Sequence, residues 1–295
     1  MRQSLLARVV VFTLAIFAAG VTASTQSAPA RIISTSPSIT ETLFALGLGD
    51  RVVGVSSYCR FPAGVAGLPK VGSYLMPDVE LMARLRPDLV FVHAAATGPA
   101  RRLESLRIPH STIEQGTSLS RVFSSMRQIA SAAGVAARGD QMVADVERRL
   151  QRVRGPARTT ARPRVLFIIG RRPGTLSDLV AIGPGGYLND LIGIAGAANV
   201  LDIVGQPEYP RISMEVVLRL DPDVIVDTVD MGDTDAERAR RQPINERLWK
   251  AYPTLAAVKA GRVHAATTDA LVVPGPRVVE AAQWVAAVLN RPAHQ

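Results

Sequence analysis

Two stretches of the chain match each other without gaps: VELMARLRPDLVF at residues 79–91 and MEVVLRLDPDVIV at residues 214–226. Each copy begins with an amphipathic segment that carries a glutamate near its start, passes through a Pro-Asp pair and ends in an apolar run. This order is typical of a helix followed by a buried strand of a parallel sheet. Because the copies lie in different halves of the chain, we predict two similar α/β lobes.

The sequence around the repeat sets the limits of the two lobes. Short β-rich runs alternate with helical stretches over residues 31–134, and the alternation restarts over residues 162–295 with the apolar run RVLFIIG at residues 164–170. Strands that alternate with helices indicate central parallel sheets flanked by helices. Residues 135–156 form a long amphipathic stretch without an apolar strand, so we predict a single long α-helix that joins the lobes.

Residues 1–23 have the pattern of a signal peptide, with a basic start, an apolar run and small residues before the cleavage point. The apolar run is too short for a permanent membrane helix. No cysteine lies at this junction, since the single cysteine is Cys59. We therefore expect an exported protein without a lipid anchor and without an internal disulfide.

The net charge of +9 raises the question of a nucleic-acid partner. The basic residues are dispersed among 25 acidic ones and form no block of five like charges, so we predict no nucleic acid as partner. The sequence contains no G-x-S-x-G, P-loop or H-E-x-x-H motif, and its four histidines are scattered. We therefore predict no enzyme and no metal site, with an exported α/β hydrolase as the alternative from another class.

Several short motifs are distributed along most of the chain that follows the signal peptide. They are SPSITE at residues 36–41, VGVSSY at 53–58, KVGSY at 70–74, ISME at 212–215 and PGPR at 274–277. Together with the repeat, they resemble the helical-backbone solute-binding proteins of ABC importers, a family whose members bind vitamin B12, haem or ferric siderophores. The resemblance is to the vitamin B12-binding members first.

The resemblance implies two rigid lobes, a shallow cleft between them and a backbone helix that limits hinge closure. It implies a periplasmic monomer that has no catalytic role and needs no cofactor apart from its ligand. The partners would be a macrocyclic or metal-chelate small molecule and the permease dimer of an importer in the inner membrane.

Three tyrosines are the main candidates for ligand contact: Tyr58, Tyr74 and Tyr209. Each lies near the end of an expected loop, and a flat aromatic face can stack on a large macrocycle at little entropic cost. In the family that the chain resembles, Tyr58 matches a cleft tyrosine, whereas Tyr74 and Tyr209 fall at tryptophan positions. We predict a corrinoid ligand, with haem or a ferric siderophore as the alternative; ordinary surface tyrosines are the simpler interpretation.

Three further residues follow predicted strands. His93 lies at the carboxyl end of a strand, where open α/β sheets bind ligands, and could coordinate cobalt or iron or be a plain polar residue. Arg171 and Arg172 follow the strand at residues 164–170. They could hold an anionic oxygen of the ligand, or be surface arginines.

Glu80 and Glu215 occupy the same place in the two copies of the repeat. A carboxylate in the first turn of a helix interacts favourably with the helix dipole, so a capping role is one interpretation. The resemblance implies another, in which the two glutamates contact arginines on the two halves of the permease dimer. We predict the second role.

Overall fold

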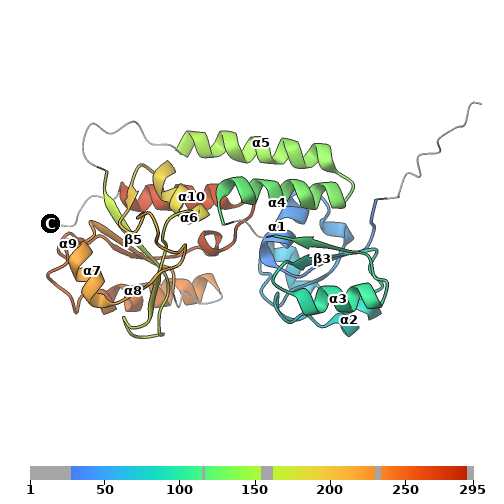
Figure 1. The fold of residues 1–295 in the computed structure, drawn as a ribbon, viewed down its shortest axis with the longest axis horizontal. Coiled ribbons are helices and arrows are strands. Elements are labelled where there is room, and N and C mark those ends of the chain that lie inside the picture. Colours follow the sequence, from blue (N-terminus) through green and yellow to red (C-terminus); the bar gives the residue numbers. More distant parts are fainter. Residues whose placement is uncertain (1–27, 115–116, 154–161, 230–233, 291–295) are drawn as a thin grey trace, which may run out of the picture.

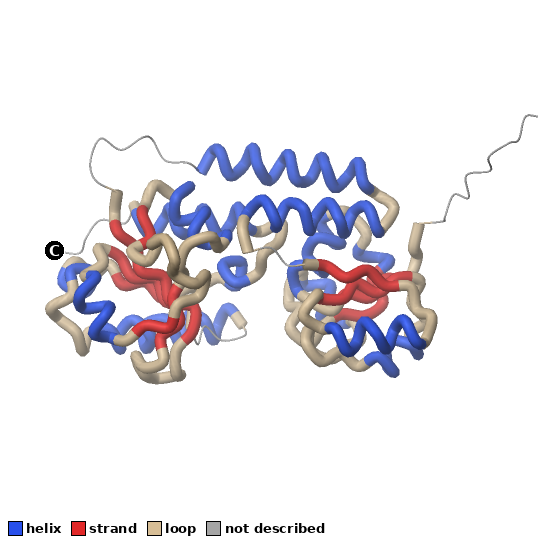
Figure 2. The backbone as a smooth tube through the Cα atoms, viewed as in Figure 1, coloured by secondary structure: helices blue, strands red, loops and turns tan. Residues whose placement is uncertain are grey.

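The structure is a computed structural model that describes residues 28–114, 117–153, 162–229 and 234–290. The predicted signal peptide lies outside the described residues. Figure 1 and Figure 2 show two lobes, each built on its own sheet, with a pair of helices lying along both. The α/β class with two lobes is thus confirmed.

The first sheet has four parallel strands in the order β2-β1-β3-β4. Its strands are β1 (Ile32–Ser34), β2 (Val52–Val55), β3 (Leu89–His93) and β4 (His110–Ile113), and its helices are α1 (Pro37–Ala45), α2 (Val79–Arg84) and α3 (Thr97–Ser105). Neighbouring side chains alternate between two apolar cores: Ile32 and Phe91 pack with α1, whereas Ile33 and Val90 pack with Met82 of α2. Both faces of the sheet are covered, which is why the inner strands β1 and β3 are mainly apolar, whereas the edge strand β4 is mainly polar.

The second sheet has six strands, and its central strands are parallel. The strands are β5 (Arg164–Gly170), β6 (Leu179–Ala181), β7 (Ala198–Asn199), β8 (Arg211–Ile212), β9 (Val224–Asp227) and β10 (Val263–Ala265). The helices are α6 (Tyr187–Ile194), α7 (Met214–Leu220), α8 (Asp235–Trp249), α9 (Ala256–Lys259) and α10 (Val278–Leu289). Strand β6 is antiparallel to β5 and β8. The sequence does not predict this edge, because strands of two or three residues are too short to show a period.

The two copies of the repeat have the same structure and the same hydrogen bonds. One copy forms α2 and β3, and the other forms α7 and β9. The aspartate of each Pro-Asp pair accepts a hydrogen bond from the backbone N–H at the start of the adjacent strand: Asp88 from Arg31 at 2.9 Å and Asp223 from Arg164 at 2.7 Å. The side chains of Arg31 and Arg164 in turn donate to the last carbonyls of α2 and α7. The repeat therefore encodes a helix-to-strand connection that each lobe uses once.

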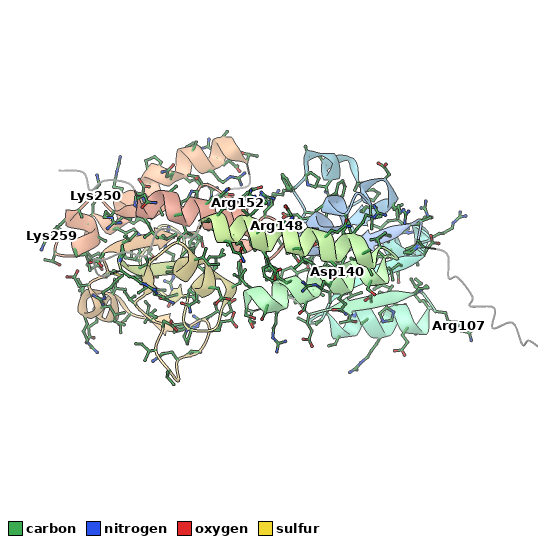
Figure 3. The ribbon with its side chains drawn as sticks, turned by 90° about the horizontal axis from the view of Figure 1, so that it is seen from above. Arg107, Asp140, Arg148, Arg152, Lys250 and Lys259 are labelled. Carbon is green, nitrogen blue, oxygen red and sulfur yellow. The ribbon has the colours of Figure 1, made fainter. Side chains whose placement is uncertain are left out.

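The lobes are joined by a helical hairpin of α4 (Leu119–Ala132) and α5 (Ala136–Val153). Helix α5 lies across both lobes. It carries Arg148 and Arg152 in its second half and, in its first half, Asp140, which pairs with Arg127 of α4 at 3.2 Å (Figure 3). The helices touch closely at Gly139, where an added Cβ would lie 2.4 Å from the Cβ of Ala130.

This connection differs from the single helix that the sequence predicts, because α4 is shared between the lobes. Val122 and Met126 belong to the core of the second lobe, whereas Ile129 belongs to the core of the first. The expected end of the connecting helix, at residues 154–156, lies outside the described residues.

Candidate ligand-binding site

A pocket of about 550 Å³ lies between the two lobes. The first lobe contributes most of its lining, and the second lobe contributes the rest. The lining residues are Ser36, Pro37, Ser38, Tyr58, Tyr74, Leu75, His93 and Ala95 from the first lobe, and Tyr209, Val272, Val273 and Pro274 from the second. The structure therefore brings together all three candidate tyrosines and His93.

Parallel strands explain why these residues of the first lobe meet. Strand β1 ends at Ser34 just before α1 begins at Pro37, and β3 ends at His93. The carboxyl ends of parallel strands lie at one edge of the sheet, which is where α/β proteins bind ligands. The position of His93 in the pocket follows from this rule.

Three aromatic rings form a row on the wall of the first lobe. The ring centroids of Tyr58 and Tyr74 are 6.0 Å apart, and those of Tyr74 and His93 are 5.4 Å apart, both with tilted planes. A tight turn places Tyr74 at its tip, because Gly72 has a φ of +88° and an added Cβ would lie 2.8 Å from the carbonyl oxygen of Met76. The row presents an aromatic surface to the pocket.

His93 is held as a neutral hydrogen-bonding group. Burial lowers its pKa from the ordinary value of 6.5. Its Nδ1 accepts a hydrogen bond of 3.0 Å from the backbone N–H of Ala95, so the proton of the neutral ring lies on Nε2. In this tautomer the Nδ1 lone pair is taken up by Ala95, and Nε2 carries a proton that it can donate.

Tyr209 faces the row of rings from the second lobe and is also uncharged. Burial, together with the carboxylate of Glu208, raises the pKa of its phenol well above the ordinary value of 10.0. The second lobe thus presents a neutral hydroxyl to the pocket.

The two candidate arginines do not line this pocket. The side chain of Arg171 is fully buried, and its guanidinium donates to Asp227 at 2.9 Å and to Asn245 at 3.0 Å. Asp227 ends β9, the strand next to β5, and also accepts a hydrogen bond from the Trp249 indole at 3.1 Å. A buried guanidinium needs such partners, so Arg171 holds the second lobe together instead of gripping a ligand. Arg172 is exposed and pairs with Asp178 at 3.0 Å.

The floor of the pocket was missed by sequence reasoning. It consists of Ser36, Pro37 and Ser38 before and within α1, and of Val272, Val273 and Pro274 before α10. Small, apolar and proline residues carry no chemical pattern of their own. The sequence points to these residues only through the motifs SPSITE and PGPR, which either include them or lie next to them.

Glu80 and Glu215 lie on the surface of separate lobes, with side chains that are 78% and 81% exposed. Neither caps its helix. The caps are Asp78, which accepts from the N–H of Leu81, and Ser213, which caps α7 in the same way. The side-chain caps thus come from other residues, while both glutamates lie in the first turns of their helices, where the helix dipole favours a carboxylate.

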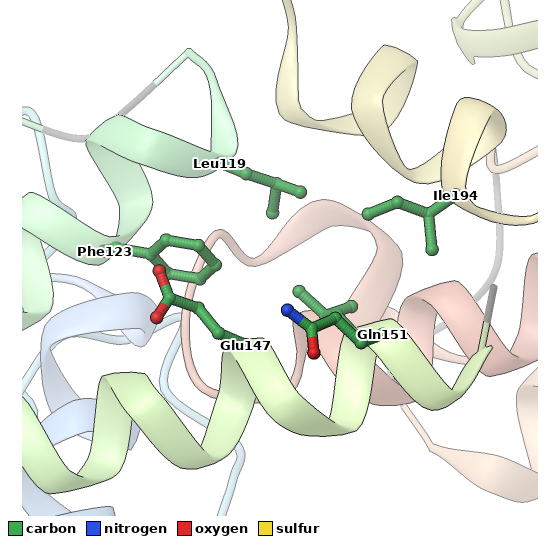
Figure 4. Close-up of a pocket in the computed structure, with 6 residues that line it drawn as sticks. Leu119, Phe123, Glu147, Gln151 and Ile194 are labelled. Carbon is green, nitrogen blue, oxygen red and sulfur yellow. The ribbon is translucent and has the colours of Figure 1, made fainter.

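A second cavity, of about 350 Å³, lies between α4, α5 and α6 (Figure 4). Its wall combines apolar side chains with two polar groups of α5: Leu119, Phe123, Leu150 and Ile194 with Glu147 and Gln151. None of the residues singled out from the sequence lines it. The pocket between the lobes is accordingly the site that the sequence and the geometry support together.

Two α/β lobes that enclose an aromatic-lined pocket and are held by a helical spine define a solute-binding protein. The comparisons agree: the chain belongs to the periplasmic binding protein family, whose model matches residues 32–270. Within the described residues, no helix combines the length and hydropathy needed to cross a membrane.

Curated relatives that match over most of the chain carry names of binding proteins. A vitamin B12-binding protein of Vibrio cholerae is 27% identical over 263 residues, which are 88% of this chain and 89% of that protein. The ABC transporter substrate-binding lipoprotein YvrC of Bacillus subtilis is 29% identical over 265 residues, 88% of this chain and 79% of that protein.

Among solved structures, the periplasmic haem-binding protein RhuT of Roseiflexus sp. RS-1 superposes with a TM-score of 0.74 at 28% identity, over 88% of this chain and 97% of that one. These relatives are named as binding or transport proteins, not as enzymes. The resemblance inferred from the motifs is confirmed.

Proposed function

We propose that this protein is the periplasmic substrate-binding protein of an ABC importer and captures a corrinoid in the pocket between its lobes. The observation that supports this ligand is the chemistry of the pocket wall. Every described residue that lines it is uncharged, with His93 neutral because burial lowers its pKa. Aromatic faces and hydroxyl groups suit a corrin ring whose rim carries amides.

The alternative ligands place different demands on the pocket. The propionates of haem and the oxygen donors of a ferric siderophore are anionic, and proteins usually meet such groups with arginine. Arg171 and Arg172 have carboxylate partners of their own in the second lobe. The V. cholerae relative named for vitamin B12 supports the corrinoid as well.

Titration of the purified protein with cyanocobalamin, haemin and a ferric hydroxamate siderophore tests the ligand. We expect calorimetry to give one corrinoid site per chain and no saturable site for the other two. No added cofactor should be needed, and sedimentation should show a monomer. If haemin produces a saturable absorbance band while cyanocobalamin does not bind, the protein is a haem carrier.

We further propose that Glu80 and Glu215 contact arginines on the two halves of the permease. Both carboxylates are exposed and sit at the first turn of equivalent helices, α2 and α7. Ion pairs at an exposed rim contribute orientation more than affinity. The present partners of the two glutamates, Arg102 and Arg219, are exposed too and can be exchanged for a permease side chain.

The double variant Glu80→Ala/Glu215→Ala should bind ligand normally but deliver it poorly to the importer in reconstituted vesicles. A matched control is Glu104→Ala/Asp202→Ala, which removes one exposed carboxylate from each lobe. Added salt should weaken docking of the native protein. Normal uptake by the first double variant would rule out the docking role.

A further inference from the structure

One ion pair connects the lobes beside the pocket. The guanidinium of Arg277 donates from Nε and Nη2 to the two carboxylate oxygens of Glu41, at 2.9 and 2.6 Å, although the residues are 236 positions apart. Both side chains are almost fully buried, at 9% and 3% exposure. Figure 1 shows the segment before α10 reaching toward α1 of the other lobe. The fork geometry makes this contact directional as well as strong.

Arg277 also contacts two further segments, those that contain Asp269 and Phe61. Its Nη1 donates to Asp269 at 2.9 Å, and Asp269 begins the short 3-10 helix Asp269–Val272 that leads into the pocket floor. The ring of Phe61, three residues after the pocket residue Tyr58, lies 4.2 Å from the guanidinium carbon. Arg277 of the second lobe therefore contacts α1 and the Tyr58 loop of the first lobe. It also contacts Asp269, which begins the helix that leads into the floor segment of its own lobe.

Each half of the pair is spaced three residues from a floor residue. Glu41 follows Ser38 on α1, and residues three apart on a helix lie on the same side. Arg277 follows Pro274, and between them an added Cβ on Gly275 would lie 3.6 Å from the backbone of Ser38. The two floor segments thus touch directly where the ion pair holds them.

We propose that Glu41 and Arg277 form a latch that sets the shape of the ligand pocket by fixing the floor segment of one lobe against that of the other. Neither residue lines the pocket, so both are positioning residues. The latch joins the lobes where the segment before α10 meets α1, and so adds a direct attachment between them to the one made by the α4–α5 hairpin. Stability alone does not account for it, because a buried ion pair is often no more stabilising than packed apolar side chains. The inference rests on the proposed ligand-binding role of this pocket.

The test replaces the ion pair with an apolar pair, Glu41→Met/Arg277→Met, which removes both charges and leaves neither buried alone. Spin labels on Arg101→Cys and Lys259→Cys, two exposed sites in different lobes, report the distance between the lobes; Cys59 is buried. We expect a broader distance distribution than in the native latch and cyanocobalamin affinity about tenfold weaker, equivalent to about 1.4 kcal/mol. The control, Arg127→Met/Asp140→Asn, removes an exposed ion pair between α4 and α5 and should change neither quantity.

The two readouts separate this inference from the ligand assignment. An unchanged distance distribution in the apolar variant overturns the latch, whatever the ligand. A broader distribution with unchanged affinity also overturns it, since the pocket then does not depend on the pair. If the protein with its native latch fails to bind cyanocobalamin but the distribution still broadens, the corrinoid assignment fails and the latch stands.

Discussion

Tyr74 occupies the centre of the aromatic row, and its truncation to alanine should weaken ligand binding without weakening the fold. The side chain lies between Tyr58 and His93 and belongs to a loop tip outside the apolar cores of the described residues. In the free protein, Tyr74 is 37% exposed. That exposed part is the area which a ligand stacked on the ring would cover.

The magnitude follows from this area. A tyrosine buries roughly 200 Å² when fully covered, so the exposed part is roughly 75 Å². At about 25 cal/mol per Å², complete coverage is worth about 2 kcal/mol, and half coverage about 1 kcal/mol. Tyr74→Ala should therefore raise the Kd for cyanocobalamin by between about 5-fold and about 30-fold.

Isothermal titration calorimetry of three variants tests this reasoning. Tyr74→Phe keeps the ring and should raise the Kd by no more than about fivefold, because a neutral hydrogen bond contributes about 1 kcal/mol. Leu106→Ala truncates a side chain of similar exposure, 45%, outside the pocket and should leave the Kd unchanged. The thermal unfolding midpoint should be the same for Tyr74→Ala as for the native protein. A Kd for Tyr74→Ala within twofold of the native value would refute the stacking role.

Three other outcomes are expected. Burial lowers the pKa of His93 below 6.5, so the unfolded chain binds this proton more readily than the folded protein. The stability that His93 confers is then fully present above about pH 6.5 and is lost as the pH falls toward the folded pKa. Chemical denaturation should show that the free energy of unfolding falls more for the native protein than for His93→Gln between pH 7.5 and 5. Parallel pH profiles of the two proteins would contradict this. Arg171→Met strands the buried carboxylate of Asp227 and should lower the free energy of unfolding by about 3–5 kcal/mol, as measured in urea, while the ligand Kd stays the same. A weakened Kd with unchanged stability would return Arg171 to the ligand site. Small-angle scattering should show little compaction on ligand binding, because the continuous helix α5 lies across both lobes; a large compaction would contradict a rigid spine.

The candidate site could be predicted in part, because some of its positions follow from local pattern. His93 was found as the last residue of an apolar strand, and the tyrosines were found because flat rings near loop ends stand out in a chain with 5% aromatic residues. The serine, valine and proline residues of the pocket floor are not singled out by any comparable pattern in the sequence. They line the pocket only because the starts of α1 and α10, far apart in the chain, are packed together.

The sequence by itself determined the two-lobe α/β architecture, since the alternation of strands with helices and the duplicated Pro-Asp connection depend on neighbours within a few dozen residues. It also identified the exposed glutamates, which occupy equivalent positions in the two copies. Only the tertiary structure decided which arginine does what. Arg171 follows a strand, a position suited to ligand contact, yet it is buried against Asp227. Arg277 is one residue of a short motif, yet it joins the lobes through Glu41. The role of an arginine depends on which carboxylate the packing of the chain brings within 3 Å of its guanidinium. No local pattern in the sequence specifies a partner 236 residues away.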